Sequence, residues 1–351
     1  MKIIDSHVHL FATPHLQNLA WMTDDNPLRA SHTLDEYCHH SLMLPGCDHG
    51  VVEAYSVDGV VVIEADVKSS LNDWSHAIAE YEWVCRIIDN KLLAGEGSSS
   101  HAGLVSAIVP WAPVPAGPQA VTEYLACLRL RNPTVTDKYL KGVRYLAQDK
   151  PSGTMTSPLF IDGVRVLGSS SSSSSSSSLS NRLVFELGID LRLGGTWQLD
   201  EAVILLDAVN SVTRIIINHY GKPDLYLSPN DLLTSDKFIH WTKAMTKFAA
   251  TNSYLKLSGF FSELPVDLIH HHHEWQDMLA RVLPWVKVGF ELFGTDRIIW
   301  GSDWPVCTIN GGKHSFNKFV ALTLALFDEL DLSDRERQAV FYDNAKRAYN
   351  L

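Results

Sequence analysis

Two histidines close to the N-terminus, His7 and His9, have the residue type and spacing that could do chemistry. They end a short apolar, β-prone segment, which predicts a strand over Lys2–His9. Alternate residues of a strand share one face, so both imidazoles should project the same way from its carboxyl end. Neutral imidazole is a common ligand of zinc and similar ions, so the pair indicates half of a metal or catalytic site. The same pattern would also arise from two histidines that lie on a half-exposed strand end and have no role in metal binding or catalysis.

Four further apolar runs end in residues that could complete such a site. They offer two carboxylates, an arginine with its neighbouring tyrosine, and a third histidine: Glu64, Arg144, Tyr145, His219 and Asp303. A carboxylate at the end of a buried strand is costly unless it is paired or bound to a metal, and a guanidinium fork can bind a carboxylate or two hydroxyl groups. Each also has a structural interpretation: His219 could pack at a turn, Asp303 could cap the next segment, and Glu64 could hold a hydrogen bond.

Eight β-rich apolar runs recur along the chain, usually with helix-like stretches between them. The predicted strands are 2–9, 59–65, 104–109, 140–146, 189–193, 214–219, 254–258 and 297–303. Residues 74–89, 120–131, 198–210, 236–250 and 274–293 carry apolar residues at helical spacing. This alternation predicts one α/β domain over residues 1–351, a (β/α)8 TIM barrel in which all strand carboxyl ends meet at one face. An open doubly wound sheet is the alternative, weakened because no glycine-rich phosphate loop follows an early strand.

Three segments depart from this alternation. A long connection follows the first predicted strand, from Phe11 to Gly59, and should form a lid or a substrate-binding wall. Its Trp21 could line a pocket or simply pack the loop. The serine tract 169–178, between predicted strands 4 and 5, cannot bury apolar surface, so we expect a disordered insertion or a placeholder for unassigned residues. The four histidines 270–273 could bind metal adventitiously, but they lie far from any predicted strand end.

Composition and charge limit the partners and the compartment. Apolar residues make up 46% of the chain and charged residues 20%, as in a protein with a sizeable core. A net charge of -11 argues against a nucleic-acid partner, and no segment suggests a membrane. The five cysteines are scattered and read as reduced thiols, which predicts a cytoplasmic protein. The oligomeric state, monomer or homodimer, stays open.

Four motifs in order resemble the amidohydrolase superfamily. They are IDSHVHLF at residues 4–11, LKGVR at 140–144, INHYGKP at 217–223 and IWGSDWP at 299–305. The chain is similar above all to the amidohydrolase-related branch that contains sugar-acid lactonases and dicarboxylate-lactone hydrolases, and residues 343–349 resemble the C-terminal helix of that branch. The similarity covers nearly the whole chain apart from the serine tract and parts of the first long connection.

This resemblance implies a lactone hydrolase with one divalent ion at most. Binuclear relatives carry histidines after strands 5 and 6, whereas predicted strand 5 ends in Arg192-Leu193-Gly194. The expected metal ligands are His7, His9, Asp303 and Glu64, with zinc as the first candidate and metal-free catalysis left open. Asp303 would act as general base, and the three histidines would polarise the carbonyl and orient the water. The expected substrate-binding residues are Arg144, Tyr145, Glu64, Trp21 and Trp304.

Two other functions remain open from the sequence. Another branch of the superfamily uses a similar histidine–histidine–aspartate site in metal-dependent decarboxylation of an aromatic or muconate-type acid. Release of carbon dioxide would distinguish that reaction from lactone opening. A non-catalytic barrel that binds a small molecule is the third interpretation, and it predicts no hydrolysis of any lactone.

Overall fold

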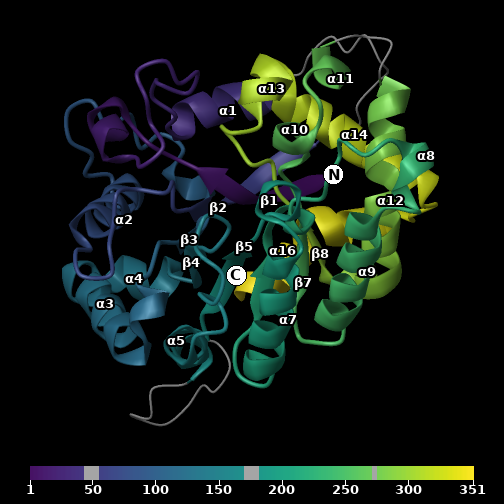
Figure 1. Cartoon of the computed structure of the whole chain (residues 1–351). Helices are drawn as coiled ribbons and strands as arrows, with labels where there is room; N and C mark the ends of the chain where they lie inside the picture. Colours follow the sequence, from purple (N-terminus) through teal and green to yellow (C-terminus); the bar gives the residue numbers. More distant parts are fainter. Residues whose placement is uncertain (43–54, 170–181, 271–274) are drawn as a thin grey trace.

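Eight parallel strands form the centre of the protein, and helices surround them (Figure 1). A computed structural model describes residues 1–42, 55–169, 182–270 and 275–351. The strands are β1 (Lys2–His9), β2 (Ser56–Ile63), β3 (Val105–Val109), β4 (Gly142–Leu146), β5 (Val184–Gly188), β6 (Ile215–Ile217), β7 (Tyr254–Leu257) and β8 (Ile298–Trp300). Valine, isoleucine and leucine dominate these segments, as expected for parallel strands that are covered on both faces.

The strands close into a (β/α)8 barrel. Strands β1 to β3 form one parallel sheet in sequence order, and β4 to β8 form a second one. Parallel bridges from Ile108 to Leu140 and from Trp111 to Arg144 join the two sheets at the β3–β4 edge. At the other edge, a parallel bridge joins Val8 to Trp304, just beyond β8. The carboxyl ends of all eight strands therefore meet at one face of the molecule.

Helices alternate with the strands and cover the outside of the barrel. The longer ones are α1 (Leu34–Leu42), α2 (Ser75–Ile88), α3 (Pro118–Arg131), α5 (Pro158–Gly168), α7 (Trp197–Val209), α9 (Asp236–Ala249), α12 (Trp275–Phe293) and α14 (Ser315–Glu329). The shorter ones are α4 (Pro133–Tyr139), α6 (Leu191–Gly194), α8 (Pro229–Leu232), α10 (Phe260–Glu263), α11 (Asp267–His270), α13 (Thr308–Gly311), α15 (Asp334–Gln338) and α16 (Asn344–Tyr349). Alternate strand residues pack against this outer layer, for example Val60, Val62 and Val143.

The inward-facing strand residues form a separate apolar core inside the barrel. It contains Ile4, Val61, Ile63, Ala107, Val109, Val184, Ile216, Tyr254 and Ile299. Ala345, Ala348 and Tyr349 of α16 pack into the same cluster, so the C-terminal helix closes the amino-terminal end of the barrel. The inside of the barrel is thus filled with apolar side chains toward its amino-terminal end, and the functional residues lie at the carboxyl ends of the strands.

The fold confirms the predicted barrel but corrects one strand. The sequence placed the fifth strand at residues 189–193, whereas β5 covers Val184–Gly188 and residues 191–194 form α6. The reason is local, because the Asp190 side chain accepts a hydrogen bond from the Leu193 N–H at 2.7 Å and caps that helical turn. β5 also ends without a histidine, so an incomplete binuclear ligand set stays a prediction.

Other predicted segments fall partly outside the described residues. The long connection after β1 contains the short helix η1 (Thr13–Asn18) and α1, while residues 43–54 are not described. The serine tract from 170 onward and the histidines 271–273 also lie outside the described residues. No helix among the described residues is long and apolar enough to span a membrane.

Candidate active site

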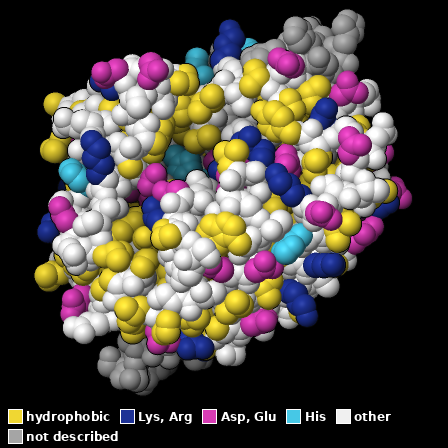
Figure 2. Space-filling model, in the orientation of Figure 1, with side chains coloured by type: hydrophobic (Ala, Val, Ile, Leu, Met, Phe, Trp, Pro, Cys, Tyr) yellow, Lys and Arg dark blue, Asp and Glu magenta, His cyan; other side chains and the backbone are white. Residues whose placement is uncertain are grey.

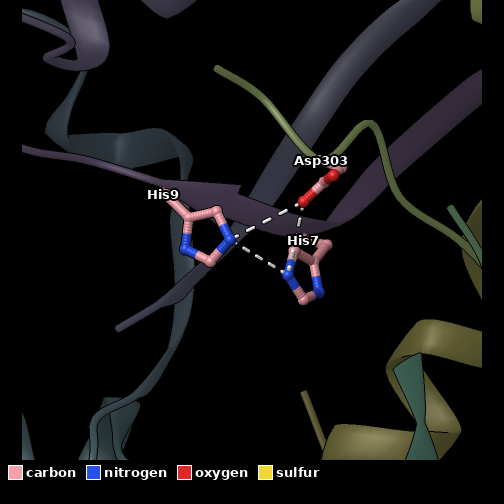
Figure 3. A group of neighbouring side chains, drawn as sticks. All are labelled: His7, His9 and Asp303. Atoms are coloured by element: carbon pink, nitrogen blue, oxygen red, sulfur yellow. Dashed lines mark hydrogen bonds and ion pairs between the residues drawn. The ribbon is translucent and has the colours of Figure 1, made fainter. Parts of the chain in front are cut away.

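Three predicted residues meet where β1 and β8 end (Figure 3). His7 Nε2 lies 3.2 Å from His9 Nε2, and Asp303 Oδ1 lies 3.7 Å and 3.6 Å from these two nitrogens. Backbone hydrogen bonds fix the arrangement, because Asp303 N–H donates to His7 O and His9 N–H donates to Trp304 O. Asp303 adopts a left-handed φ of 62°, which this backbone pairing supports.

His219 approaches the same carboxylate from β6. Its Nε2 lies 3.8 Å from Asp303 Oδ1, and its ring centroid lies 4.6 Å from that of His7. The residue has a left-handed φ of 52°, and its Nδ1 lies 2.8 Å from Ser258 Oγ. A Cβ at Gly259 would come within 2.5 Å of this Nδ1, so the glycine is needed for the close approach of the ring.

Hydrogen bonds behind the site orient the imidazole of His9. Its Nδ1 lies 2.8 Å from the backbone carbonyl of Glu64, and a carbonyl only accepts. His9 therefore carries its hydrogen on Nδ1 and presents the lone pair of Nε2 to Asp303 and His7. This is the orientation that metal-binding histidines usually have.

Burial determines the charge of the histidines. It lowers the pKa of His7 well below the ordinary value, and it lowers the pKa of His219 to about 3, so both rings are neutral near pH 7. Burial alone would raise the pKa of Asp303, but His219 and His9 outweigh it and lower that pKa below its usual range. The centre therefore consists of one carboxylate facing three histidine Nε2 atoms in a water-poor environment.

Arg144 and Glu64 lie beside this centre as an ion pair. Arg144 Nη1 is 3.3 Å from Glu64 Oε1, and the same nitrogen donates to the Glu64 carbonyl at 3.3 Å. The Arg144 Nε is buried and has no partner among the described residues. The other Glu64 oxygen accepts from Asp66 N–H, so the structure does not bring the Glu64 carboxylate to His7, His9 and Asp303.

The predicted aromatic residues occupy different positions. Tyr145 points to the outer side of β4, where its ring packs 5.9 Å from Phe160, so the structure does not bring it to the centre. Trp304 follows Asp303 and is fully buried, with an Nε1 that has no partner among the described residues. Trp21 donates from Nε1 to Ala65 O at 2.8 Å, next to the carboxyl end of β2.

Sequence reasoning missed three polar residues around the centre. Lys256 on β7 and Glu186 on β5 form a fully buried ion pair inside the barrel, with Lys256 Nζ 3.1 Å from His7 Nδ1. Asn218, directly before His219, is fully buried, and neither of its amide atoms has a partner among the described residues. The sequence does contain a signal for Lys256 and Glu186, because each is a charged residue within an otherwise apolar strand, YLKL and VFELG.

The donor atoms are spaced as one divalent ion requires. Zinc–ligand bonds of about 2.0–2.2 Å place neighbouring tetrahedral ligands roughly 3.3–3.6 Å apart. The atoms offered by His7, His9 and Asp303 all lie within 4.8 Å of one another. His9 has its free lone pair directed to this position, so the residues present fit a single ion. On the face shown in Figure 2, a histidine side chain lies recessed in a hollow beside acidic and basic side chains.

Comparisons with known proteins agree with the fold. Residues 196–351 match the family model described as Amidohydrolase. An L-rhamnono-gamma-lactonase from Scheffersomyces stipitis is 36% identical over 358 residues, covering 100% of this chain and 99% of the relative. An L-fucono-1,5-lactonase from Burkholderia ambifaria is 32% identical over 139 residues, covering 39% of this chain and 42% of the relative.

A solved structure shares the whole architecture. The crystal structure of an amidohydrolase from Burkholderia multivorans with bound zinc has a TM-score of 0.70 and 20% identity, and each chain is covered completely. At that identity the likeness concerns the fold. Together with the relative that is similar along its whole length, these findings show that the protein belongs to the amidohydrolase family.

Proposed function

We propose that this protein hydrolyses a lactone, a cyclic ester, of a sugar acid. The observation that carries the proposal is a buried, ionised Asp303 whose Oδ1 faces the Nε2 atoms of three histidines at 3.6–3.8 Å. The relatives named as lactonases support the substrate class, since one of them is similar along its entire length.

Asp303 serves the reaction as general base. A water between Asp303 and the lactone carbonyl carbon loses a proton to the carboxylate as its oxygen forms the new C–O bond. The bond between the carbonyl carbon and the ring oxygen then breaks, and the proton on Asp303 passes to that oxygen. The products are the open-chain acid and a hydroxyl group, so one water is consumed and the carboxylate is restored.

His7 and His219 stabilise the charge that develops on the carbonyl oxygen. Neutral imidazoles can donate from one nitrogen without bringing a positive charge of their own, and burial strengthens such hydrogen bonds. The rings of His9 and His219 lie 4.8 Å and 4.6 Å from that of His7, and they restrict where the water and the carbonyl can sit. Because the rings are buried, bulk water does not compete for their hydrogen bonds.

A divalent ion would be held by His9 and Asp303, with His7 or His219 as the third donor. The Nε2 atoms of the latter two are 3.7 and 3.8 Å from Asp303 Oδ1. When bound, such an ion supplies Lewis-acid polarisation of a carbonyl or a water. Zinc is the proposed ion because the donor set is two or three imidazoles and a carboxylate.

Arg144 is proposed to bind hydroxyl groups of the sugar acid. Arg144 is 6% exposed, and its Nε–H has no partner among the described residues. A buried donor without a partner is unfavourable, and a substrate hydroxyl or ring oxygen would satisfy it. Trp304 and Trp21 are proposed to form apolar walls near the ends of β8 and β2.

A panel of sugar-acid and dicarboxylate lactones tests this function directly. Hydrolysis releases acid, so a pH indicator follows turnover, and metal content is measured on the same preparation. We expect turnover of at least one sugar-acid lactone without release of carbon dioxide. Carbon dioxide release from an aromatic acid, with no lactone turned over, would instead support a decarboxylase.

A further inference from the structure

Lys256 lies beneath His7 inside the barrel and is entirely buried. Its Nζ is 2.9 Å from Ser6 O, 3.1 Å from His7 Nδ1, and 2.9 Å and 2.8 Å from the two oxygens of Glu186. Glu186 also accepts a hydrogen bond from the hydroxyl of Tyr349, which belongs to α16 at the closed end of the barrel. A chain of four side chains thus runs from the C-terminal helix to the active site.

The groups around Lys256 show that its ammonium group is the hydrogen-bond donor in these contacts. An ammonium group has three N–H donors and no acceptor. The three neighbouring residues offer three kinds of acceptor: the Ser6 carbonyl, the Glu186 carboxylate and the His7 Nδ1 lone pair. Because Glu186 is itself buried and needs a cation, the charged pair is the arrangement that satisfies every partner.

Donation from Lys256 fixes where the hydrogen of His7 sits. If Nδ1 accepts from the ammonium, the single hydrogen of the neutral imidazole must be on Nε2. That N–H points at His9 Nε2, 3.2 Å away, which is an acceptor because His9 carries its own hydrogen on Nδ1. Each hydrogen-bond donor therefore faces an acceptor along the whole series, from Lys256 through His7 and His9 to the carbonyl of Glu64.

We propose that Lys256 is a positioning residue that holds His7 with its hydrogen on Nε2, so that this N–H, which faces His9 in the free protein, is available to the carbonyl oxygen of a bound substrate. A metal ligand needs a lone pair at that nitrogen, so the same contact disfavours coordination of an ion by His7. The catalytic part of this inference rests on the proposed lactonase function, whereas the position of the hydrogen does not.

The position of the hydrogen is measurable by nitrogen-15 NMR of histidine-labelled, metal-free protein. The His7 signals are assigned by their loss in His7→Gln. We expect His7 to show a protonated Nε2 and an unprotonated Nδ1, and we expect this pattern to be lost in Lys256→Met. A wild-type spectrum with the hydrogen on Nδ1 of His7 would overturn the proposal.

Lys256→Met leaves Glu186 buried without its cation, which destabilises the fold. The double variant Lys256→Met/Glu186→Gln removes both charges, and it should lose the His7 pattern in the same way. Lys141→Met is the matched control, because Lys141 also donates to a backbone carbonyl, that of Asn350, at 3.1 Å but does not contact His7. The control should keep the wild-type His7 spectrum. If the control loses the pattern as Lys256→Met does, the effect does not come from the contact with His7 and the assignment fails.

Zinc affinity supplies an independent readout. We expect the Lys256 variants to bind zinc at least tenfold more tightly than the wild type in calorimetric titrations. Arg144→Met removes another nearby cation without touching Nδ1 of His7, so it should change zinc affinity much less. Equal tightening in both variants would mean that charge alone is responsible and would refute the role of the hydrogen. If no lactone is hydrolysed while His7 keeps its hydrogen on Nε2, the proposed function fails and the assignment of the hydrogen stands.

Discussion

Replacement of Asp303 by asparagine removes the proposed base while preserving the shape of the side chain. The residue is 3% exposed, and its backbone N–H donates to His7 O, a bond that the substitution keeps. An amide has no lone pair basic enough to accept a proton from water near pH 7. The effect should therefore fall on the chemical step and not on the assembly of the barrel.

The magnitude follows from the role of a positioned base. General acid–base catalysis contributes about 10²–10⁴-fold, which corresponds to roughly 3–5 kcal/mol of activation free energy. Because His7, His9 and His219 stay in place, binding of the lactone should change little. We therefore expect kcat to fall by about two to four orders of magnitude while KM stays within a few-fold of the wild-type value.

Steady-state lactone hydrolysis, followed by acid release, measures this effect. Asp58→Asn is the matched control, because Asp58 pairs with Lys2 at the surface, at the amino-terminal end of β1 and β2. Thermal unfolding of both variants checks that the fold is retained. If folded Asp303→Asn keeps the wild-type kcat, the assignment of the base is wrong.

Three further predictions concern substrate binding, pH and metal. Arg144→Met should raise KM about tenfold or more with a smaller change in kcat, and an unchanged KM would argue against substrate binding by this residue. Burial lowers the pKa of His32 to about 4, so the unfolded chain binds more protons between about pH 6.5 and pH 4. The free energy of unfolding should therefore fall more on acidification in the wild type than in His32→Gln, as measured by urea titration at pH 7 and pH 5. Elemental analysis of zinc-loaded protein should find no more than one ion per chain, and His9→Gln should lose it.

The barrel could be predicted from the sequence because most strands are short runs rich in valine, isoleucine and leucine. Runs such as Val60–Ile63 combine β-branched residues with flanking polar ones, and the residues after them fall automatically at one face of the fold. Once the barrel was assumed, His7, His9, His219 and Asp303 had to converge. The structure brings all four together.

The remaining features depend on contacts between segments far apart in the sequence. Residues 189–193 look β-prone, and only the cap formed by Asp190 turns them into a helix. Tyr145 and Arg144 are neighbours, so the side of the strand each faces depended on the register of β4. The contact of Lys256 with His7 joins residues 249 positions apart, which no local pattern reveals.

The bridge between β1 and the segment after β8 also determines when the active site can exist during synthesis. Asp5 accepts a hydrogen bond from Ser302 N–H across 297 residues, so the two halves of the centre are synthesised far apart in time. Until the last strand has left the ribosome, β1 has one unpaired edge and His7 has no carboxylate beside it. The nascent chain must therefore hold a nearly complete set of strands open, exposed to aggregation through that edge, and it acquires its catalytic centre only after synthesis has passed residue 303.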